Sequence, residues 1–233
     1  MNKLAVRIQH IPERERWAKY LAQMLNENRQ PQNKLEIITD EKHDLWTGAK
    51  KTLQSYKPGD THLLVLQDDV LPCKDLIFAA EQIVELLPNN HISLFSIGDW
   101  PAIPGVRWAN LKTWRMAQCY IAPVTMIEDF IAWSDRHIKP EIYFDDDRWA
   151  MYLFANNILT YASNPSLVEH LGWNQSTLTG YQPGTVFEPR IRMAKNFIGF
   201  EKSALDIDWS QGIDKPLLIN EGTWSEFDHN YLP

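Results

Sequence analysis

Cysteine, basic residues and long apolar runs are scarce in this sequence, and each scarcity excludes a class of protein. Only two of the 233 residues, Cys73 and Cys119, are cysteines, which excludes a fold built on several disulfides and indicates reduced thiols. The 23 Lys and Arg are outnumbered by 30 Asp and Glu, and the net charge of -7 argues against a general nucleic-acid-binding surface. No window is apolar enough to span a bilayer and no apolar signal segment precedes the first strand, so we expect a cytoplasmic chain without stable membrane insertion.

What is present is typical of a globular protein with many aromatic residues. The hydrophobic fraction is 44% and the charged fraction 23%, as in an ordinary folded domain. Ten tryptophans are unusual for this length. Their flat side chains stack on sugars and bases, but they also fill cores, and composition does not separate these uses.

The first half alternates β-rich runs with amphipathic helical segments. This pattern predicts a wound α/β sheet that begins with a right-handed βαβ unit. Past Gly98 the texture changes, and two successive β-like runs, 106–113 and 116–122, suggest a hairpin in a mixed or antiparallel region. We expect strands at 3–8, 35–38, 63–66, 92–97, 142–144 and 158–162, and helices at 13–28, 44–56, 75–87, 125–134 and 148–156.

The run Leu63 to Leu66 predicts a strand buried on both faces, and it ends at the carboxylates of Asp68 and Asp69. Ligands of open α/β sheets bind at the carboxyl ends of such strands. Paired acids there can hold a divalent cation, which in turn neutralises a phosphate. The alternative is that the two acids only solvate a strand end and begin a turn.

Three motifs in this order resemble those of GT-A glycosyltransferases, which use nucleotide sugars and have a single Rossmann-like domain. They are Gln67-Asp68-Asp69 at a strand end, Asp145-Asp146-Asp147 before a helix, and Pro165-Ser166-Leu167-Val168-Glu169-His170-Leu171-Gly172. The resemblance covers roughly residues 1–175 and implies an α/β fold with a mainly parallel central sheet flanked by helices. It divides the chain into a nucleotide-sugar-binding half (1–97), an acceptor-binding and catalytic half (98–199) and a wrapping C-terminal tail (200–233).

The resemblance also implies a metal site. Asp69 would ligate Mn²⁺ or Mg²⁺, Asp68 would lie near the ribose, and His170 would be the second protein ligand. Gln67 stands where the strict acidic motif has its first acid, which leaves the division of labour between the two aspartates open. An imidazole beside oxygen ligands suits Mn²⁺ better than Mg²⁺. The alternative for His170 is a histidine that only hydrogen-bonds to the backbone.

Candidate donor-binding residues follow the first two expected strands and occupy the next helix. In the family the base and ribose meet these strand ends, and Lys50 would face a phosphate. Turn chemistry and core filling are the alternative for each of these positions. The candidates, beside Asp68, are His10, Ile11, Asp40, Trp46 and Lys50.

The acidic triplet is the candidate catalytic site. In similar transferases an acid here accepts the proton of the acceptor hydroxyl, which nominates Asp146 or Asp147, with Asp145 as the helix cap. Favourable interaction with the helix dipole is the simpler alternative. Because the triplet is a literal D-x-D, it is also a second candidate for the metal site.

The sequence therefore predicts a metal-dependent glycosyltransferase that moves a sugar, with UDP as the favoured carrier, to an acceptor hydroxyl on a glycan or a hydroxymethylated DNA base. A positioned base favours inversion. The alternatives are a metal-dependent phosphoesterase or nuclease, and a non-catalytic carbohydrate-binding protein. The oligomeric state is not predicted. Candidate acceptor-binding residues are Asp99, Trp100, Trp114, Arg115 and Trp173.

Overall fold

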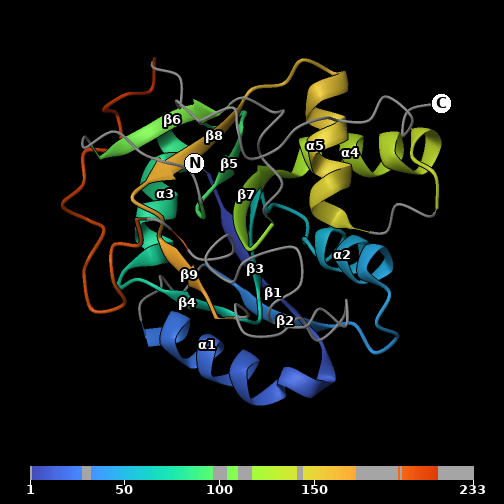
Figure 1. Cartoon of the computed structure of the whole chain (residues 1–233), viewed down its shortest axis with the longest axis horizontal. Coiled ribbons are helices and arrows are strands. Elements are labelled where there is room, and N and C mark those ends of the chain that lie inside the picture. Colours follow the sequence, from blue (N-terminus) through green and yellow to red (C-terminus); the bar gives the residue numbers. More distant parts are fainter. Residues whose placement is uncertain are drawn as a thin grey trace, which may run out of the picture.

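The computed structural model describes residues 2–27, 33–96, 104–109, 117–140, 144–171, 194 and 196–214. A seven-stranded sheet forms its centre, and a second sheet has two strands (Figure 1). The predicted fold class is confirmed, because the central sheet is mainly parallel and helices flank it. Its strands, in spatial order, are β2 (Leu35–Thr39), β1 (Leu4–His10), β3 (His62–Gln67), β7 (Cys119–Pro123), β5 (His91–Ser93), β8 (Thr160–Asn164) and β6 (Gly105–Ala109).

Five strands of the central sheet share one direction. Strand β1 is parallel to β2 and β3, and β5 is parallel to β8. Strand β7 is antiparallel to both β3 and β5, and β6 is antiparallel to β8. The carboxyl ends of β1, β2 and β3 therefore lie at one edge of the sheet, and the residues that follow these strands come together there.

The expected hairpin between 106–113 and 116–122 is wrong. Strand β6 pairs with β8, whereas β7 lies between β3 and β5. All five residues of β7 are buried, so the strand needs a covered position in the middle of the sheet. Neighbouring runs in sequence often pair, but burial of both faces of β7 outweighs that tendency here.

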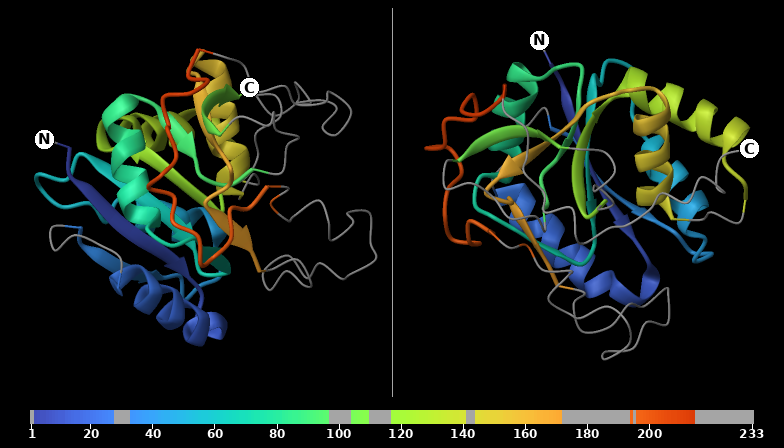
Figure 2. Two further views of the ribbon diagram at one scale, coloured as in Figure 1. Left: turned by 90° about the vertical axis from the view of Figure 1, so that its left-hand side faces the viewer. Right: turned by 45° about the horizontal axis from the view of Figure 1, so that its top comes forward.

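Helices cover both faces of the sheet (Figures 1 and 2). The buried residues of α1 (Glu15–Glu27) and α3 (Leu76–Leu86) belong to one apolar cluster. The other cluster includes Leu53 of α2 (Leu45–Leu53) and most of the buried apolar residues of α4 (Val124–His137) and α5 (Asp145–Ala155). A short 3-10 helix, η1 (Pro12–Arg14), joins β1 to α1. Within the parts of the chain that the structure describes, none of the helices combines the length and apolarity needed to cross a membrane.

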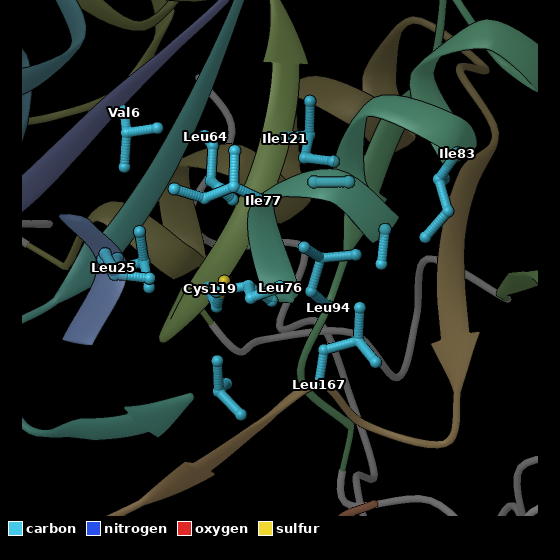
Figure 3. Close-up of a cluster of buried hydrophobic side chains, with 14 of the residues drawn as sticks. Val6, Leu25, Leu64, Leu76, Ile77, Ile83, Leu94, Cys119, Ile121 and Leu167 are labelled. Atoms are coloured by element: carbon cyan, nitrogen blue, oxygen red, sulfur yellow. The ribbon is translucent and has the colours of Figure 1, made fainter. Parts of the chain in front are cut away.

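Strand β3 supplies both cores, as its four consecutive aliphatic residues predict. Leu64 and Leu66 join the cluster beneath α1 and α3, and Leu63 and Val65 join the opposite cluster. All four side chains are fully buried. Figure 3 shows Leu64 with Leu76, Ile77 and Ile121 in the first cluster, where helix α3 packs over β3 and β7.

Helix α1 buries only some of the apolar residues that recur at helical spacing along it. Trp17 and Tyr20 are each 52% exposed, although both fit the helical period of apolar residues. The buried positions are Ala18, Leu21, Ala22 and Leu25. Small residues let the helix lie close to the sheet, and the large aromatic rings are left at its margin.

Part of the C-terminal region packs on the core of the domain. Ala204 and Trp209 are buried in the cluster beneath α3. The backbone N–H of Val106 in β6 donates to the carbonyl of Trp209 over 3.2 Å. Residues 196–214 therefore form part of the folded domain.

Candidate functional site

The ends of β1, β2 and β3 bring four of the predicted donor-binding residues together. His10 Nδ1 lies 3.0 Å from Oδ2 of Asp68, and the N–H of Ile11 donates to the same oxygen over 3.1 Å. The N–H of Asp40 donates to the carbonyl of His10 over 2.7 Å. This contact network follows directly from the order β2-β1-β3, which places the three strand ends side by side.

The small second sheet brings His170 to the acidic pair. Its strands are β4 (Val70–Pro72), directly after Asp69, and β9 (Val168–His170), and they pair antiparallel with Val70 opposite His170. The N–H of Leu171 donates to the carbonyl of Asp69 over 2.7 Å. His170 Nε2 consequently lies 3.3 Å from Oδ2 of Asp69.

The segment before β9 is fixed to the loop after β5. Ser166 Oγ accepts a hydrogen bond from the N–H of Ser96 over 2.8 Å and donates to its carbonyl over 3.1 Å. The N–H of Leu167 donates to the carbonyl of Leu94. The ring of Phe95 then meets His170 edge to face, with 6.3 Å between centroids. These contacts explain why a serine and a buried leucine precede the histidine.

Sequence reasoning missed a cation at this site. Arg14 Nη1, from η1, donates to Asp68 Oδ1 over 3.0 Å and to Asp69 Oδ2 over 2.5 Å. Its side chain is only 17% exposed. The signal in the sequence was an arginine four residues past the end of the first strand, but it reads equally well as the solvated face of the following helix.

Burial and the neighbouring charges shift the pKa values of these three groups in different directions. Burial raises the pKa of Asp68, and the charge of Asp69 raises it further, in spite of Arg14. Burial also acts to raise the pKa of Asp69, but the hydrogen bond and charge of His170 together with the charge of Arg14 lower it overall. Burial opposes the charge on Arg14, yet the two carboxylates raise its pKa. Asp69 is therefore the more firmly ionised member of the pair.

The chemistry of Asp69 and His170 fits a divalent cation. A carboxylate oxygen and an imidazole nitrogen are suitable donors for Mn²⁺. Asp69 Oδ1 is buried and accepts no hydrogen bond in the structure as described. The described residues contain no group of three or more His, Cys, Asp or Glu that could hold a metal ion. A cation at this position would thus have few protein ligands, which is the usual arrangement where substrate phosphates supply the others.

The structure places Trp46 and Lys50 apart from the acidic pair. Lys50 Nζ forms an ion pair with Asp135 of α4, and none of its described contacts is with Asp68 or Asp69. The ring of Trp46 meets Phe130 edge to face at 5.7 Å, and the Arg148 guanidinium lies 4.3 Å above it. Trp46 is thus partly buried and packs against the helical layer beside the start of α5, and its role in donor binding stays a prediction.

The acidic triplet opens α5, but Asp145 is not its cap. Phe144 occupies the N-cap position, and Asp145 is the first helical residue. Asp145 is buried, with Oδ2 among the side-chain atoms that have no hydrogen-bond partner in the described structure. Burial raises its pKa to about 6. Asp146 and Asp147 are partly exposed, and Asp146 Oδ1 accepts a hydrogen bond from the N–H of Asp147 over 2.9 Å.

The other predicted positions lie outside the described residues. These are the acceptor-binding candidates Asp99, Trp100, Trp114, Arg115 and Trp173, together with most of the short strand expected at 142–144. Their roles stay predictions from the sequence.

No protein-family model matches this chain, and no curated protein does. Among solved structures, it is similar to a mutant Drosophila β-1,4-galactosyltransferase 7 in complex with manganese, UDP-Gal and xylobiose. The identity is 7%, the TM-score is 0.44, and the match covers 73% of this chain and 71% of the other. It is also similar to the apo form of the glycosyltransferase GlyE of Streptococcus pneumoniae TIGR4, with 10% identity, a TM-score of 0.39 and coverage of 69% and 45%. The chain thus spans less than half of GlyE. Likenesses this distant carry no functional argument.

Proposed function

We propose that this chain is a glycosyltransferase that moves a sugar from a nucleotide-sugar donor, with UDP as the favoured carrier, to an acceptor hydroxyl. The observation that supports the proposal is the meeting of Asp69 and His170 at the carboxyl end of the central strand β3, 3.3 Å apart. Ligands of open α/β sheets bind at this edge. The triplet of acids at the start of α5 supplies candidate bases.

Asp69 and His170 would hold a divalent cation, Mn²⁺ or Mg²⁺, through a carboxylate oxygen and Nε2. When bound, the cation neutralises the charge that develops on the departing nucleoside diphosphate. The fold itself holds the side chains of Asp69 and His170 in position. The pairing of β4 with β9 and the hydrogen bond from Leu171 to Asp69 do so through the backbone.

Asp68 would accept a hydrogen bond from the ribose of the donor. Its carboxylate is held by His10, by the N–H of Ile11 and by Arg14, so its orientation is set before a ligand arrives. His10, Ile11 and Asp40 would line the nucleotide side of the site, because they lie at the carboxyl ends of the two neighbouring strands. Trp46 and Lys50 have no part in this proposal, since their described contacts are with α4 and α5.

Asp146 or Asp147 would act as general base. In the transfer step, the acceptor hydroxyl oxygen bonds to the anomeric carbon while the bond from that carbon to the diphosphate oxygen breaks. The hydroxyl proton passes to the aspartate carboxylate. A single displacement of this kind inverts the anomeric configuration.

The test is a panel of nucleotide sugars incubated with glycan acceptors or with duplex DNA containing hydroxymethylcytosine, with Mn²⁺ present and released nucleoside diphosphate as the readout. We expect release that depends on one sugar and one acceptor. Asp146→Asn or Asp147→Asn is expected to lower that rate at least a hundredfold, while Asp206→Asn, at an exposed position, leaves it unchanged. Hydrolysis of phosphodiesters without a sugar donor would instead support the phosphoesterase alternative.

A further inference from the structure

A single guanidinium nitrogen bridges the two carboxylates at the end of β3. Arg14 Nη1 lies 3.0 Å from Asp68 Oδ1 and 2.5 Å from Asp69 Oδ2. Arg14 lies at the end of η1, shortly after β1. The strand order that joins His10 to Asp68 therefore also places the Arg14 guanidinium beside the two carboxylates. Its side chain is largely buried, which strengthens its attraction to the acids relative to a pair in water.

Three of the four carboxylate oxygens of this pair already accept hydrogen bonds. Asp68 Oδ2 accepts from Ile11 and lies against His10, while Asp68 Oδ1 and Asp69 Oδ2 both accept from Arg14. Asp69 Oδ1 alone is buried without a hydrogen bond in the described structure. A divalent cation that binds Asp69 would therefore meet a carboxylate whose charge Arg14 already balances. The cation at Oδ1 and the guanidinium at Oδ2 would then share one carboxylate.

We propose that Arg14 is the resting counter-cation of the acidic pair and must leave Asp69 before a divalent cation is held there. This inference rests on the cation site of the proposed function and adds a requirement to it. Two positive groups on one carboxylate repel each other, so the cation alone binds weakly. The negative diphosphate of a donor can pair with both the divalent cation and Arg14. The donor and the cation therefore favour each other's binding. When both bind, Arg14 moves from the carboxylates toward the diphosphate.

Arg14→Gln removes the charge and keeps a polar side chain, and Arg14→Lys keeps the charge. Arg16→Gln is the matched control, because it makes the same change of net charge two residues further on, at an exposed position of α1. The measurement is the Kd of Mn²⁺ at constant ionic strength without nucleotide, from the electron paramagnetic resonance signal of free Mn²⁺. We expect Arg14→Gln to bind Mn²⁺ at least tenfold more tightly than the native chain, and Arg16→Gln and Arg14→Lys to stay within about threefold of it.

An equal or weaker affinity of a folded Arg14→Gln chain would overturn the inference. A measurement on the native chain covers the case in which that variant does not fold. Mg²⁺ is titrated into protein labelled with ¹⁵N-arginine, and the Arg14 side-chain signal, assigned by its loss in Arg14→Lys, is expected to shift while that of Arg16 does not. An unmoved Arg14 signal at saturating Mg²⁺ would equally overturn it.

Neither experiment uses a sugar donor, so the two proposals fail separately. A chain that binds Mn²⁺ more tightly without Arg14 but transfers no sugar would refute the proposed function and leave the competition standing. A chain that transfers sugar while Arg14→Gln binds Mn²⁺ no more tightly would refute only the competition.

Discussion

His170 Nε2 lies 3.3 Å from Asp69 Oδ2, although 101 positions separate the two residues in the sequence. Both are fixed through the backbone, because Asp69 immediately precedes β4 and His170 ends β9, and these strands pair. The imidazole is 6% exposed and the carboxylate 12%, so both sit at the inner end of the site. A pair fixed in this way has its donor atoms in place before any ligand binds, which lowers the cost of binding.

Replacing His170 by Gln is expected to weaken Mn²⁺ binding in the presence of UDP at least tenfold, equivalent to about 1.4 kcal/mol. The reason is the loss of the imidazole nitrogen that faces Asp69. The measurement is thermal unfolding with UDP over a range of Mn²⁺ concentrations, since a ligand that binds the folded state raises the melting temperature. His43→Gln is the control, because His43 is exposed and pairs with Glu13.

Equal Mn²⁺ dependence in the native chain and in His170→Gln would exclude His170 as a ligand. Asp69→Asn provides the complementary result and is expected to remove the Mn²⁺-dependent part of the stabilisation by UDP. If Asp69→Asn retained it while Asp147→Asn lost it, the metal would lie at the acidic triplet, the second candidate from the sequence.

The sequence was sufficient to predict the sheet and its buried centre. The run Leu63 to Leu66 is apolar at consecutive positions, so neither face of that strand tolerates water, and the structure buries all four side chains. The alternation of strands and helices then predicts a layered α/β domain. What local pattern does not contain is strand order, which is why β7 was misplaced in a hairpin.

The charged residues of the site were harder to predict than its apolar frame. Arg14 and Lys50 both look like solvated helix positions, yet Arg14 binds the acidic pair and Lys50 binds Asp135. An ion pair between distant segments depends on the final packing, and it leaves no periodic trace in the sequence. The burial of Asp145 was missed as well, because it depends on how α5 lies on the sheet. The sequence alone predicted that Asp145 would cap the helix.

The buried carboxyl of Asp145 predicts a pH dependence of stability. Its pKa is raised by burial from 3.8 to about 6, so between these values the folded chain holds a proton that the unfolded chain releases. The free energy of unfolding therefore falls as pH rises through this window, by about 2 kcal/mol between pH 4 and pH 7. Chemical denaturation of the native chain and of Asp145→Asn at several pH values measures this contribution as a difference.

The difference in free energy of unfolding, native minus Asp145→Asn, is expected to decline from pH 4 to pH 7. Titrating groups that do not interact with Asp145 behave alike in both chains and cancel in that difference. Asp206→Asn, at an exposed position, is expected to give a flat difference over the same range. A flat difference for Asp145→Asn as well would mean that its carboxyl is solvated.

A substitution at Gly105 tests how closely residues 196–214 pack on β6. Its φ is +139°, and an added Cβ would lie 1.8 Å from the carbonyl oxygen of Gln211. Gly105→Ala is therefore expected to cost about 3 kcal/mol or more in stability. Gly59→Ala is the control for backbone strain alone, since Gly59 has φ of +90° but only Lys3 Nζ nearby, at 3.8 Å, and we expect a cost of about 1–2 kcal/mol. Equal costs in urea denaturation would show that Gln211 moves aside freely.

The helical layer over β7 is stabilised by stacked aromatic rings, and Trp149 lies at its centre. Its side chain is fully buried, its ring stacks on Phe130 with 3.7 Å between centroids, and its Nε1–H donates to the hydroxyl of Tyr120 over 3.3 Å. Trp149→Ala is expected to cost about 3–5 kcal/mol, because the surrounding sheet and helices cannot close so large a cavity. Trp149→Phe keeps a ring in the stack, so its cost is expected to be smaller.

Trp17→Ala, at a half-exposed position of α1, is expected to change stability by no more than about 0.5 kcal/mol. Urea denaturation measures all three, and equal costs at positions 17 and 149 would contradict the packing of α5 on the sheet, on which the placement of the acidic triplet also depends.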